Sequence, residues 1–367
     1  MDSQAQQHLI AQRVAYFRSL QGLNQHELSQ RMNFNQRQTL SDIERGERKV
    51  TANELKKFAE IFGISPLVLI DAFVPATNVE FSWRTASGTE ALQVFEQRGR
   101  NIINLISTLR TKLEKAPAPT ATLPLGENSR YEDAAQAAEH LVERYNLGDR
   151  PAKRLLSLYE SLGLDCIHLD LPASISGAAI VTDVAVIAVI NAFQVRGRRH
   201  FDMAHELFHC MTWRTMPPKH IDPIIVKTGK KRSRTEELAD VFAGALLMPG
   251  QALRNALPSD ASMAQLMRVA DDFEVSVDAL IWRMVSLHIL TKDEAQQLLA
   301  QPHQPGNGNP QNFEHSSLLS PALLQLLAEA LTAGIISVRR AAELIEISID
   351  GLAATYAQHQ LPVPFDL

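Results

Sequence analysis

The sequence predicts a multidomain protein, with an all-α N-terminal domain, a central α+β domain and a small helical C-terminal region. Apolar residues recur at helical spacing through the N-terminal part. An apolar, β-branched run at residues 184–191 lies between helical patterns and is typical of a buried strand. Two stretches rich in Pro, at residues 116–129 and 301–317, predict flexible connections between the parts.

These observations divide the chain into five segments. We expect the first domain at residues 1–80 and a connecting helix with a proline-rich linker at residues 81–129. The central domain is expected at residues 130–300, a second linker at 301–317 and the helical C-terminal region at 318–367.

Composition narrows the class of protein. The chain has 367 residues, of which 45% are hydrophobic and 21% charged, which excludes global disorder. It shows neither an apolar run of about 18 residues nor a leader peptide, so we expect no membrane association. Cys166 and Cys210 are the only cysteines, which favours a reducing cytoplasm. The net charge of −5 excludes a generally basic nucleic-acid coat but not one small DNA-reading module.

The N-terminal region predicts five short helices. Apolar residues from Leu9 to Leu20 recur every three to four positions, and this helix is expected to end at Gly22. Asn24 is a candidate N-cap for the second helix, with Glu27 three residues later. The later helices are expected to end at Gly46, to span residues 53–62 and to begin at Ser65-Pro66. Such a series suits a helix-turn-helix DNA-binding domain.

The residues here resemble a known family. The stretch NQHELSQRMNFNQRQTLSDIERGERKVTANELKKFAEIFGIS is similar to the XRE (Cro-type) helix-turn-helix family, and the likeness covers residues 8–72. The SDIERGER ending is its most specific part. The turn at residues 32–35 departs from the pattern, because it lacks the usual glycine and is one residue longer.

The resemblance implies binding to a double-stranded DNA operator. Residues 1–75 hold nine Lys and Arg against eight Asp and Glu, so this expectation rests on the motif and not on charge. A solvated face of a protein-interaction module is the alternative. The expected base-reading residues are Asn35, Gln36, Arg37, Gln38 and Thr39, and the expected phosphate-binding residues are Arg45, Arg48 and Lys49.

A long amphipathic pattern follows at residues 86–115, with Leu92, Phe95, Ile102, Ile103, Ile106 and Leu109 on one side. The ordinary explanation is that this apolar side packs against the protein's own core. The more specific alternative is that it packs against a helix of a second subunit. Because the XRE family usually reads two half-sites as a dimer, we expect a homodimer without assigning its interface to this helix.

The central domain contains the run RHFDMAHELFH on an expected helix. Its helices are expected at 133–145 and 151–162, and its strands at 164–169, 178–181 and 184–191. On the helix, His205 and His209 lie one turn apart on one face, so both imidazoles can reach one metal ion, and Glu206 could address a water on it. Two histidines do not suffice for a catalytic zinc, which needs a third protein ligand.

A helix at residues 234–248 offers that ligand. Glu236 and Asp240 lie four apart on one face, so Glu236 can bind metal while Asp240 orients a ligand histidine. Glu237 points elsewhere and is the weaker candidate. The alternative is that the histidines are half-buried polar residues and that Glu236 is a solvated first-turn acid. His200 and His220 are nearby, but each is more often a surface residue.

Residues 130–290 resemble the ImmA/IrrE family of zinc-dependent peptidase domains. The resemblance rests on two runs of residues, one from Arg199 to His209 and the other, EELADVFAGALLMP, starting at Glu236. Asp240 stands where Asn is usual, and Phe208 replaces a common glycine and is expected to narrow the site. The resemblance implies a gluzincin-like metallopeptidase fold and peptide-bond hydrolysis, with a repressor-type protein as the usual target. The XRE fusion is an architecture of bacterial and mobile-element regulators.

Three functions therefore stand. The first is a DNA-binding transcriptional regulator with a zinc metalloendopeptidase, in which Glu206 is the catalytic base and His205, His209 and Glu236 hold the metal. Zinc is expected, and manganese could occupy a site with a carboxylate. The second is a regulator whose peptidase-like domain senses a small molecule or partner without cutting. The basic loop at residues 227–234 is compatible with this sensor function. The third is an antitoxin-like or phage-type repressor. The three short helices expected at residues 320–367 suggest a protein-interaction element.

Overall fold

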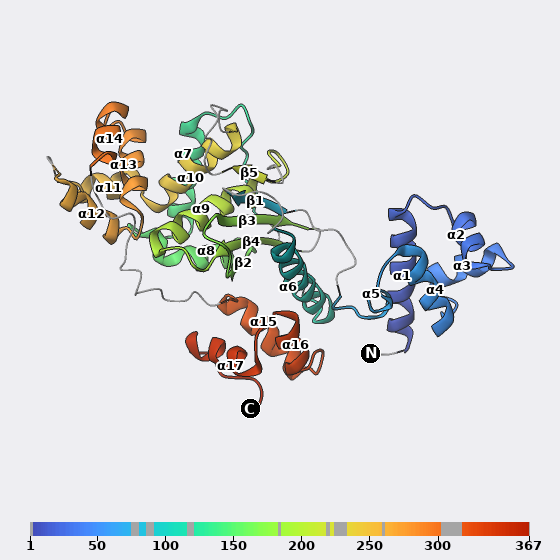
Figure 1. Ribbon diagram of the computed structural model, residues 1–367. Helices are drawn as coiled ribbons and strands as arrows, with labels where there is room; N and C mark the ends of the chain where they lie inside the picture. Colours follow the sequence, from blue (N-terminus) through green and yellow to red (C-terminus); the bar gives the residue numbers. More distant parts are fainter. Residues whose placement is uncertain are drawn as a thin grey trace. The chain divides into compact units, whose positions relative to one another are not determined.

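The computed structural model describes residues 3–74, 81–85, 92–115, 121–182, 185–217, 221–223, 233–258, 261–301 and 318–366 (Figure 1). By its internal contacts the chain divides into two units. One comprises residues 1–78 with 100–108, and the other comprises residues 79–99 with 109–367. Among the described residues, no helix is both long and apolar enough to span a bilayer.

The first unit confirms the five predicted helices within residues 3–74. They are α1 (Ser3–Leu20), α2 (Gln25–Met32), α3 (Arg37–Glu44), α4 (Ala52–Phe62) and α5 (Pro66–Ile70). The core between them is built from side chains such as Leu28, Leu40, Phe58 and Leu69, which are all inaccessible to solvent. Because α2 to α5 have only 5 to 11 residues and are too short to be stable alone, this shared core holds the unit together.

Local capping interactions define α2, the helix that precedes the expected DNA-reading residues. Asn24 caps α2 as predicted, since its side chain accepts from the Glu27 N–H and Glu27 accepts from the Asn24 N–H. At the other end of α2, Asn33 has a φ of 59°, a left-handed conformation that asparagine tolerates better than most residues. Asn33 therefore replaces the glycine that the turn lacks, and α3 begins at Arg37 with Gln36 at its N-cap.

The helix α6 (Leu92–Lys112) follows, within the predicted range of 86–115. Ile102, Ile103, Ile106 and Leu109 are buried as predicted. The part of the prediction at residues 86–91 lies outside the described residues, and so does the Leu92 side chain. Residues 100–108 of α6 are counted in the first unit, where Asn104 donates to the Ala72 carbonyl at 3.1 Å.

The second unit is built around a sheet of five described strands in the order β2-β4-β3-β1-β5. β3 is antiparallel to β4 and β1, while β2–β4 and β1–β5 are parallel pairs. The sequence predicted β2, β3 and β4 but neither β1 nor β5, and β1 lies in the segment expected to connect the domains. The strands are β1 (Phe81–Thr85), β2 (Asp165–Leu169), β3 (Ile175–Val181), β4 (Val186–Asn191) and β5 (Ile221–Pro223).

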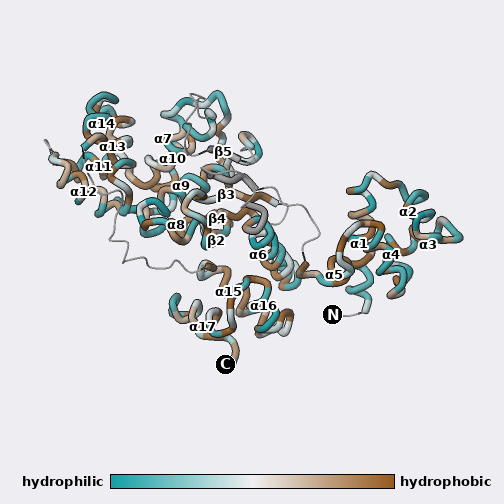
Figure 2. The backbone as a smooth tube through the Cα atoms, in the orientation of Figure 1, coloured by the Kyte–Doolittle hydropathy of each residue, from teal (hydrophilic) through white to brown (hydrophobic). Residues whose placement is uncertain are grey.

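Helices cover the sheet and complete an apolar core (Figure 2). Helix α9 (Arg196–Thr212) packs against β3 and β4, and α10 (Arg234–Leu247) packs against both α9 and α7 (Tyr131–Arg144). The other elements are the 3₁₀ helix η2 (Pro151–Arg154), α8 (Leu155–Ser161), α11 (Gly250–Ala256), α12 (Met263–Asp272), α13 (Val277–Ser286) and α14 (Lys292–Leu299). The fold thus brings α9 and α10 side by side.

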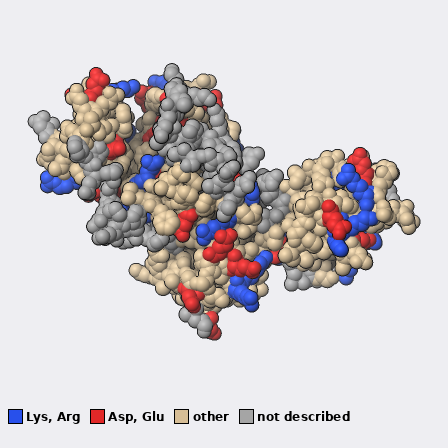
Figure 3. Space-filling view, viewed as in Figure 1, with Lys and Arg blue, Asp and Glu red and all other residues tan. Residues whose placement is uncertain are grey.

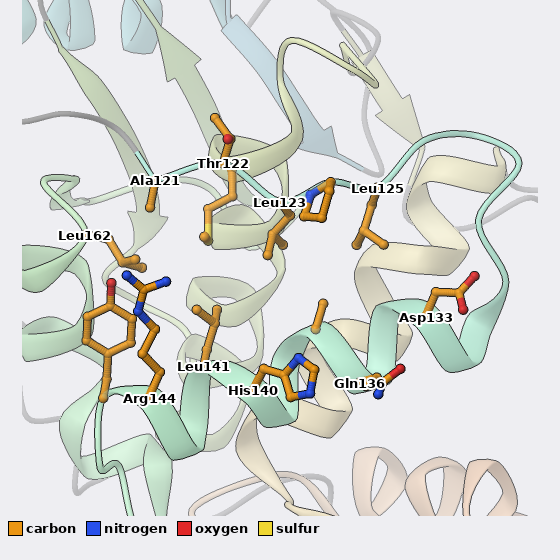
Figure 4. Close-up of a pocket in the computed structure, with 14 residues that line it drawn as sticks. Ala121, Thr122, Leu123, Leu125, Asp133, Gln136, His140, Leu141, Arg144 and Leu162 are labelled. Atoms are coloured by element: carbon orange, nitrogen blue, oxygen red, sulfur yellow. The ribbon is translucent and has the colours of Figure 1, made fainter.

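Part of the first predicted linker is packed and not free. Figure 4 shows the extended segment from Ala121 to Leu125 running beside α7, where it borders a cavity of about 410 Å³. Leu123 and Leu125 are buried, and the Leu123 N–H donates to the Met211 carbonyl at 3.0 Å. The expectation of a flexible connection is therefore wrong for residues 121–125, while residues 116–120 lie outside the described ones.

The C-terminal region forms the three predicted helices within residues 318–366. They are α15 (Pro321–Thr332), α16 (Val338–Leu344) and α17 (Ile349–Gln358). Just before α15, Leu319 forms an antiparallel bridge with Ile167 of β2, and the His168 N–H donates to the Leu318 carbonyl at 3.1 Å. This segment covers part of the outer edge of β2, which would otherwise present unpaired backbone groups. Of the second predicted linker, residues 302–317 lie outside the described ones.

Candidate metal centre

Helix α9 carries the two histidines of the central motif. His205 and His209 project from adjacent turns, and their Nε2 atoms lie 3.0 Å apart. The start of α9 is fastened by Arg199, which donates to the Ala192 and Gln194 carbonyls that follow β4. Gly197 permits a close approach to the chain before α13, because a Cβ there would lie 2.7 Å from the Val275 carbonyl carbon. The helix is thus held at its first turn.

Helix α10 brings a carboxylate to the two imidazoles. The Glu236 oxygens lie 2.9 Å from His209 Nε2 and 3.2 Å from His205 Nε2. Potential ligand atoms of the three residues all lie within 4.8 Å of one another, and this is the one such group of metal-binding side chains found among the described residues. Two imidazoles and one carboxylate match the three protein ligands of a catalytic zinc site. The donor set therefore fits a divalent transition metal.

Asp240 lies one turn after Glu236 and contacts the other ring nitrogen of His205. Its Oδ1 is 2.9 Å from His205 Nδ1, so the imidazole can donate to the carboxylate. Such a bond places the proton on Nδ1 and leaves the Nε2 lone pair directed towards Glu236 and His209. The geometry agrees with the orienting position expected for Asp240.

Glu206 lies beside the sheet. Its side chain is buried, and a Cβ added to Gly177 of β3 would lie 3.4 Å from Glu206 Cγ and 2.6 Å from the Val189 carbonyl oxygen. Only glycine fits at position 177 without movement of the neighbouring strand or of Glu206. Sequence reasoning did not identify Gly177, although an isolated glycine within a strand often marks such a close approach.

The centre is enclosed by protein. His205 and Glu206 are 0% and 1% exposed, and His209 and Glu236 are 3% and 5% exposed. Burial raises the pKa of Glu236, but the charges and hydrogen bonds of His205 and His209 outweigh it and hold that pKa far below its usual range. Glu236 is therefore ionised at neutral pH, as a metal ligand must be.

The other side chains named near the motif lie elsewhere. His200 is mostly buried, contrary to expectation, and its Nδ1 lies 3.0 Å from the Glu274 carbonyl oxygen. Glu237 accepts from the Tyr131 hydroxyl at 2.5 Å, which agrees with its weaker candidacy as a ligand. His220 and residues 224–232, which include most of the basic loop, lie outside the described residues.

Phe208 lies between the apolar core and one of the candidate ligands. Its side chain is fully buried, and its ring packs against Phe242 with centroids 5.5 Å apart. It therefore fills the apolar core between α9 and α10, and it also meets the His209 ring edge-on, with centroids 5.8 Å apart. That Phe208 narrows the site stays a prediction.

The expected DNA-reading residues lie on and around the start of α3. Asn35, Gln36 and Gln38 are exposed, Thr39 is partly exposed, and Arg37 is the first residue of the helix. Gln38 Nε2 donates to Asp42 at 2.9 Å, so this amide would change partners on meeting a base. The exposed polar side chains suit a recognition surface.

The expected phosphate-binding residues hold intramolecular partners. Arg45 pairs with Glu47 at 2.7 Å and Arg48 pairs with Glu54 at 2.8 Å, while Lys49 is exposed. On the described surface of this unit, Figure 3 shows basic and acidic side chains interleaved, with no broad basic field on the face in view. These ion pairs would have to open or shift for the arginines to contact phosphates.

Comparison with known families agrees with both resemblances. Residues 14–69 match the helix-turn-helix family, and residues 160–284 match a peptidase family described as the IrrE N-terminal-like domain. The chain contains both predicted modules. The IrrE-like match spans α9 and α10, so it covers all three candidate ligands and Glu206. No curated protein matches this sequence.

The fusion supports two functional statements. The helix-turn-helix module makes the protein a DNA-binding regulator, and the IrrE-like domain is metallopeptidase-like. The predicted fold class, an all-α module followed by an α+β domain and C-terminal helices, is confirmed. The IrrE-like match begins at residue 160, so β1 and α7 complete the sheet and the helix layer from outside it.

Proposed function

We propose that this protein is a cytoplasmic transcriptional regulator whose IrrE-like domain is a metal-dependent endopeptidase that cleaves a repressor-type protein. The observation that carries the proposal is the convergence of His205, His209 and Glu236, with Glu206 on the same helix as the two histidines. A general base beside a three-ligand metal site is the arrangement that metal-dependent peptide hydrolysis uses.

Each side chain has a distinct task. His205, His209 and Glu236 would hold the ion, with zinc expected from the donor set and manganese as the alternative. The ion supplies Lewis acidity, which brings the pKa of water to about 7 and polarises the peptide carbonyl. Glu206 takes a proton from the attacking water and delivers it to the departing amine nitrogen. Asp240 keeps the His205 ring in the orientation that ligation needs.

The DNA-binding part of the proposal rests on α3. Asn35, Gln36, Arg37, Gln38 and Thr39 would read base edges, and two copies of the chain would address two half-sites of one operator. In the full-length protein, replacing both Arg37 and Gln38 by Ala should abolish preference for the operator over random DNA. Equal affinity of the wild-type protein for both DNAs would contradict sequence-specific reading.

Glu206→Gln tests the peptidase proposal. The amide keeps the shape of the side chain but takes up no proton, so the variant should retain metal and operator binding and lose cleavage. New protein N-termini in cells with the wild-type protein, absent with Glu206→Gln, would identify the substrate. The target genes should remain repressed in the variant.

One observation favours a second function, in which the domain is a sensor that does not cut. His205, Glu206 and His209 are all nearly inaccessible, so a peptide could reach them only after a rearrangement. A sensor needs the metal but not the general base. If Glu206→Gln regulates normally while His205→Ala does not, the sensor describes the protein and the peptidase proposal is wrong.

A further inference from the structure

A second cavity adjoins the candidate metal centre through Asp240. Its volume is about 470 Å³, within the range of small-molecule sites. Asp240 is among its lining residues, but neither metal-binding histidine nor Glu206 is. The cavity is therefore next to the centre and distinct from it. Nothing in the proposed peptidase chemistry uses it.

Aromatic rings from three helices form the apolar wall. Tyr131 begins α7, Phe201 lies on α9 and Trp282 lies on α13. Tyr131 is 41% exposed and Trp282 is 46% exposed, although large rings contribute most to stability when buried. Exposed aromatic faces around a concave space are typical of a ligand site and costly without one.

The wall carries two carboxylates and two cations, so the sign of the ligand depends on how each of them is engaged. Glu237 and Asp240 contribute carboxylates, and the Arg283 guanidinium is already compensated by Glu139 at 2.8 Å. At the edge of the cavity, Arg234 stacks 3.9 Å over the Tyr131 ring and lies 3.6 Å from a Glu237 oxygen. The wall thus already holds one guanidinium between a ring and a carboxylate.

We propose that this cavity binds a small planar organic cation, of the amidine, guanidine or aromatic amine class. Its ring or planar cation would lie against Trp282 and Phe201, and its charge would face Asp240. Lys292 also lines the cavity and is exposed. Its positive charge repels a bound cation and therefore limits the affinity of the cavity for it.

The occupant would act on the metal centre through Asp240. A cation beside this carboxylate weakens the negative potential that Asp240 exerts at His205 Nδ1, and the imidazole becomes a poorer metal ligand. Binding of the cation and of the metal would therefore be mutually unfavourable, by the same factor in both directions. This coupling rests on the proposed metal centre, whereas the cavity's affinity for cations does not.

Benzamidine is the probe for the binding step. Calorimetric titration of the full-length, metal-free protein should show saturable binding, with benzoate binding more weakly. Trp282→Ala should weaken the benzamidine affinity by about tenfold, in line with a partly desolvated cation–π contact. Lys292→Met should strengthen the affinity because it removes the opposing charge. Phe193→Ala is the matched control, since Phe193 is 50% exposed but does not line the cavity.

The outcomes separate the two claims. Unchanged benzamidine affinity in Trp282→Ala, or tighter binding of benzoate, would overturn the cavity assignment. With benzamidine at saturation, the metal affinity of the wild-type protein should fall by up to about threefold, because the cation offsets only the Asp240 charge and leaves its hydrogen bond with His205 in place. If benzamidine binds and the metal affinity does not change, the coupling is wrong. If the protein binds no metal, the proposed function fails while the benzamidine result stands.

Discussion

Replacing Asp240 by Ala should weaken metal binding without removing a ligand. The carboxylate lies 2.9 Å from His205 Nδ1, so the substitution removes the acceptor that fixes the ring and its tautomer. Loss of such a partner typically weakens metal affinity by about 10- to 100-fold, or about 1.4 to 2.7 kcal/mol. Because the Asp240 side chain is 25% exposed, water can replace part of the interaction, and we expect the lower end, about tenfold.

Competition with a chromophoric chelator measures this change. Asp240→Asn is the matched control, since its amide oxygen can still accept from His205 Nδ1 and only the charge is lost. We expect Asn to weaken metal binding by less than about threefold, as part of the effect of the full truncation. An Ala variant with wild-type metal affinity would refute the orienting role of Asp240. An Asn variant as weak as Ala would show that charge, and not the hydrogen bond, dominates.

Three further predictions follow from the same geometry. Purified protein should carry about one equivalent of a divalent transition metal by elemental analysis, and His205→Ala or Glu236→Ala should lose most of it. Gly177→Ala should lower the free energy of unfolding by about 1 to 3 kcal/mol, because its Cβ would overlap the adjacent strand, and should reduce activity more than metal content. Burial lowers the pKa of His200 below its ordinary value of 6.5, so the unfolded state takes up the proton first and stability falls as the pH drops below about 6.5. Denaturant titration at two pH values should show that the free energy of unfolding falls less on acidification in His200→Gln than in the wild-type protein.

Local signals account for the elements that sequence reasoning identified. The helices of the first unit were predicted from periodicity and capping residues, and Asn24 with Glu27 forms the expected reciprocal cap. The strand β4 was identified because it lies in an apolar run that is rich in β-branched residues. In each case the information lies within a few neighbouring residues, where propensity and capping act.

The unpredicted strands depend on distant residues. β1 pairs with β3, which lies far along the chain, and β5 is a strand of three residues that pairs with β1. Neither segment carries a pattern strong enough to predict a strand by itself. The packed part of the first linker has the same explanation, because its prolines suggested a flexible chain while Leu123 and Leu125 find a core supplied by other segments.

The candidate metal centre was predictable for a different reason. The spacing of His205 and His209 on one helix, and the chemical need for a third ligand, pointed to Glu236 before any distance was known. The contribution of Gly177 could not be found in this way, because it depends on a close approach between a strand and a helix. The contact of Phe208 with Phe242 was not predictable for the related reason that the direction of its ring follows from how α9 packs against α10.

The bridge between Leu319 and Ile167 has a practical consequence for shortening the chain. A protein truncated near residue 300 would keep both matched modules and the candidate metal-binding side chains, so it would be an obvious choice for a minimal functional fragment. Such a cut would uncover hydrogen-bonding groups along β2, beginning with the His168 N–H that Leu318 now satisfies. A bare strand edge recruits other strands, so the truncated protein should self-associate through β2, and its aggregation would be mistaken for native oligomer formation.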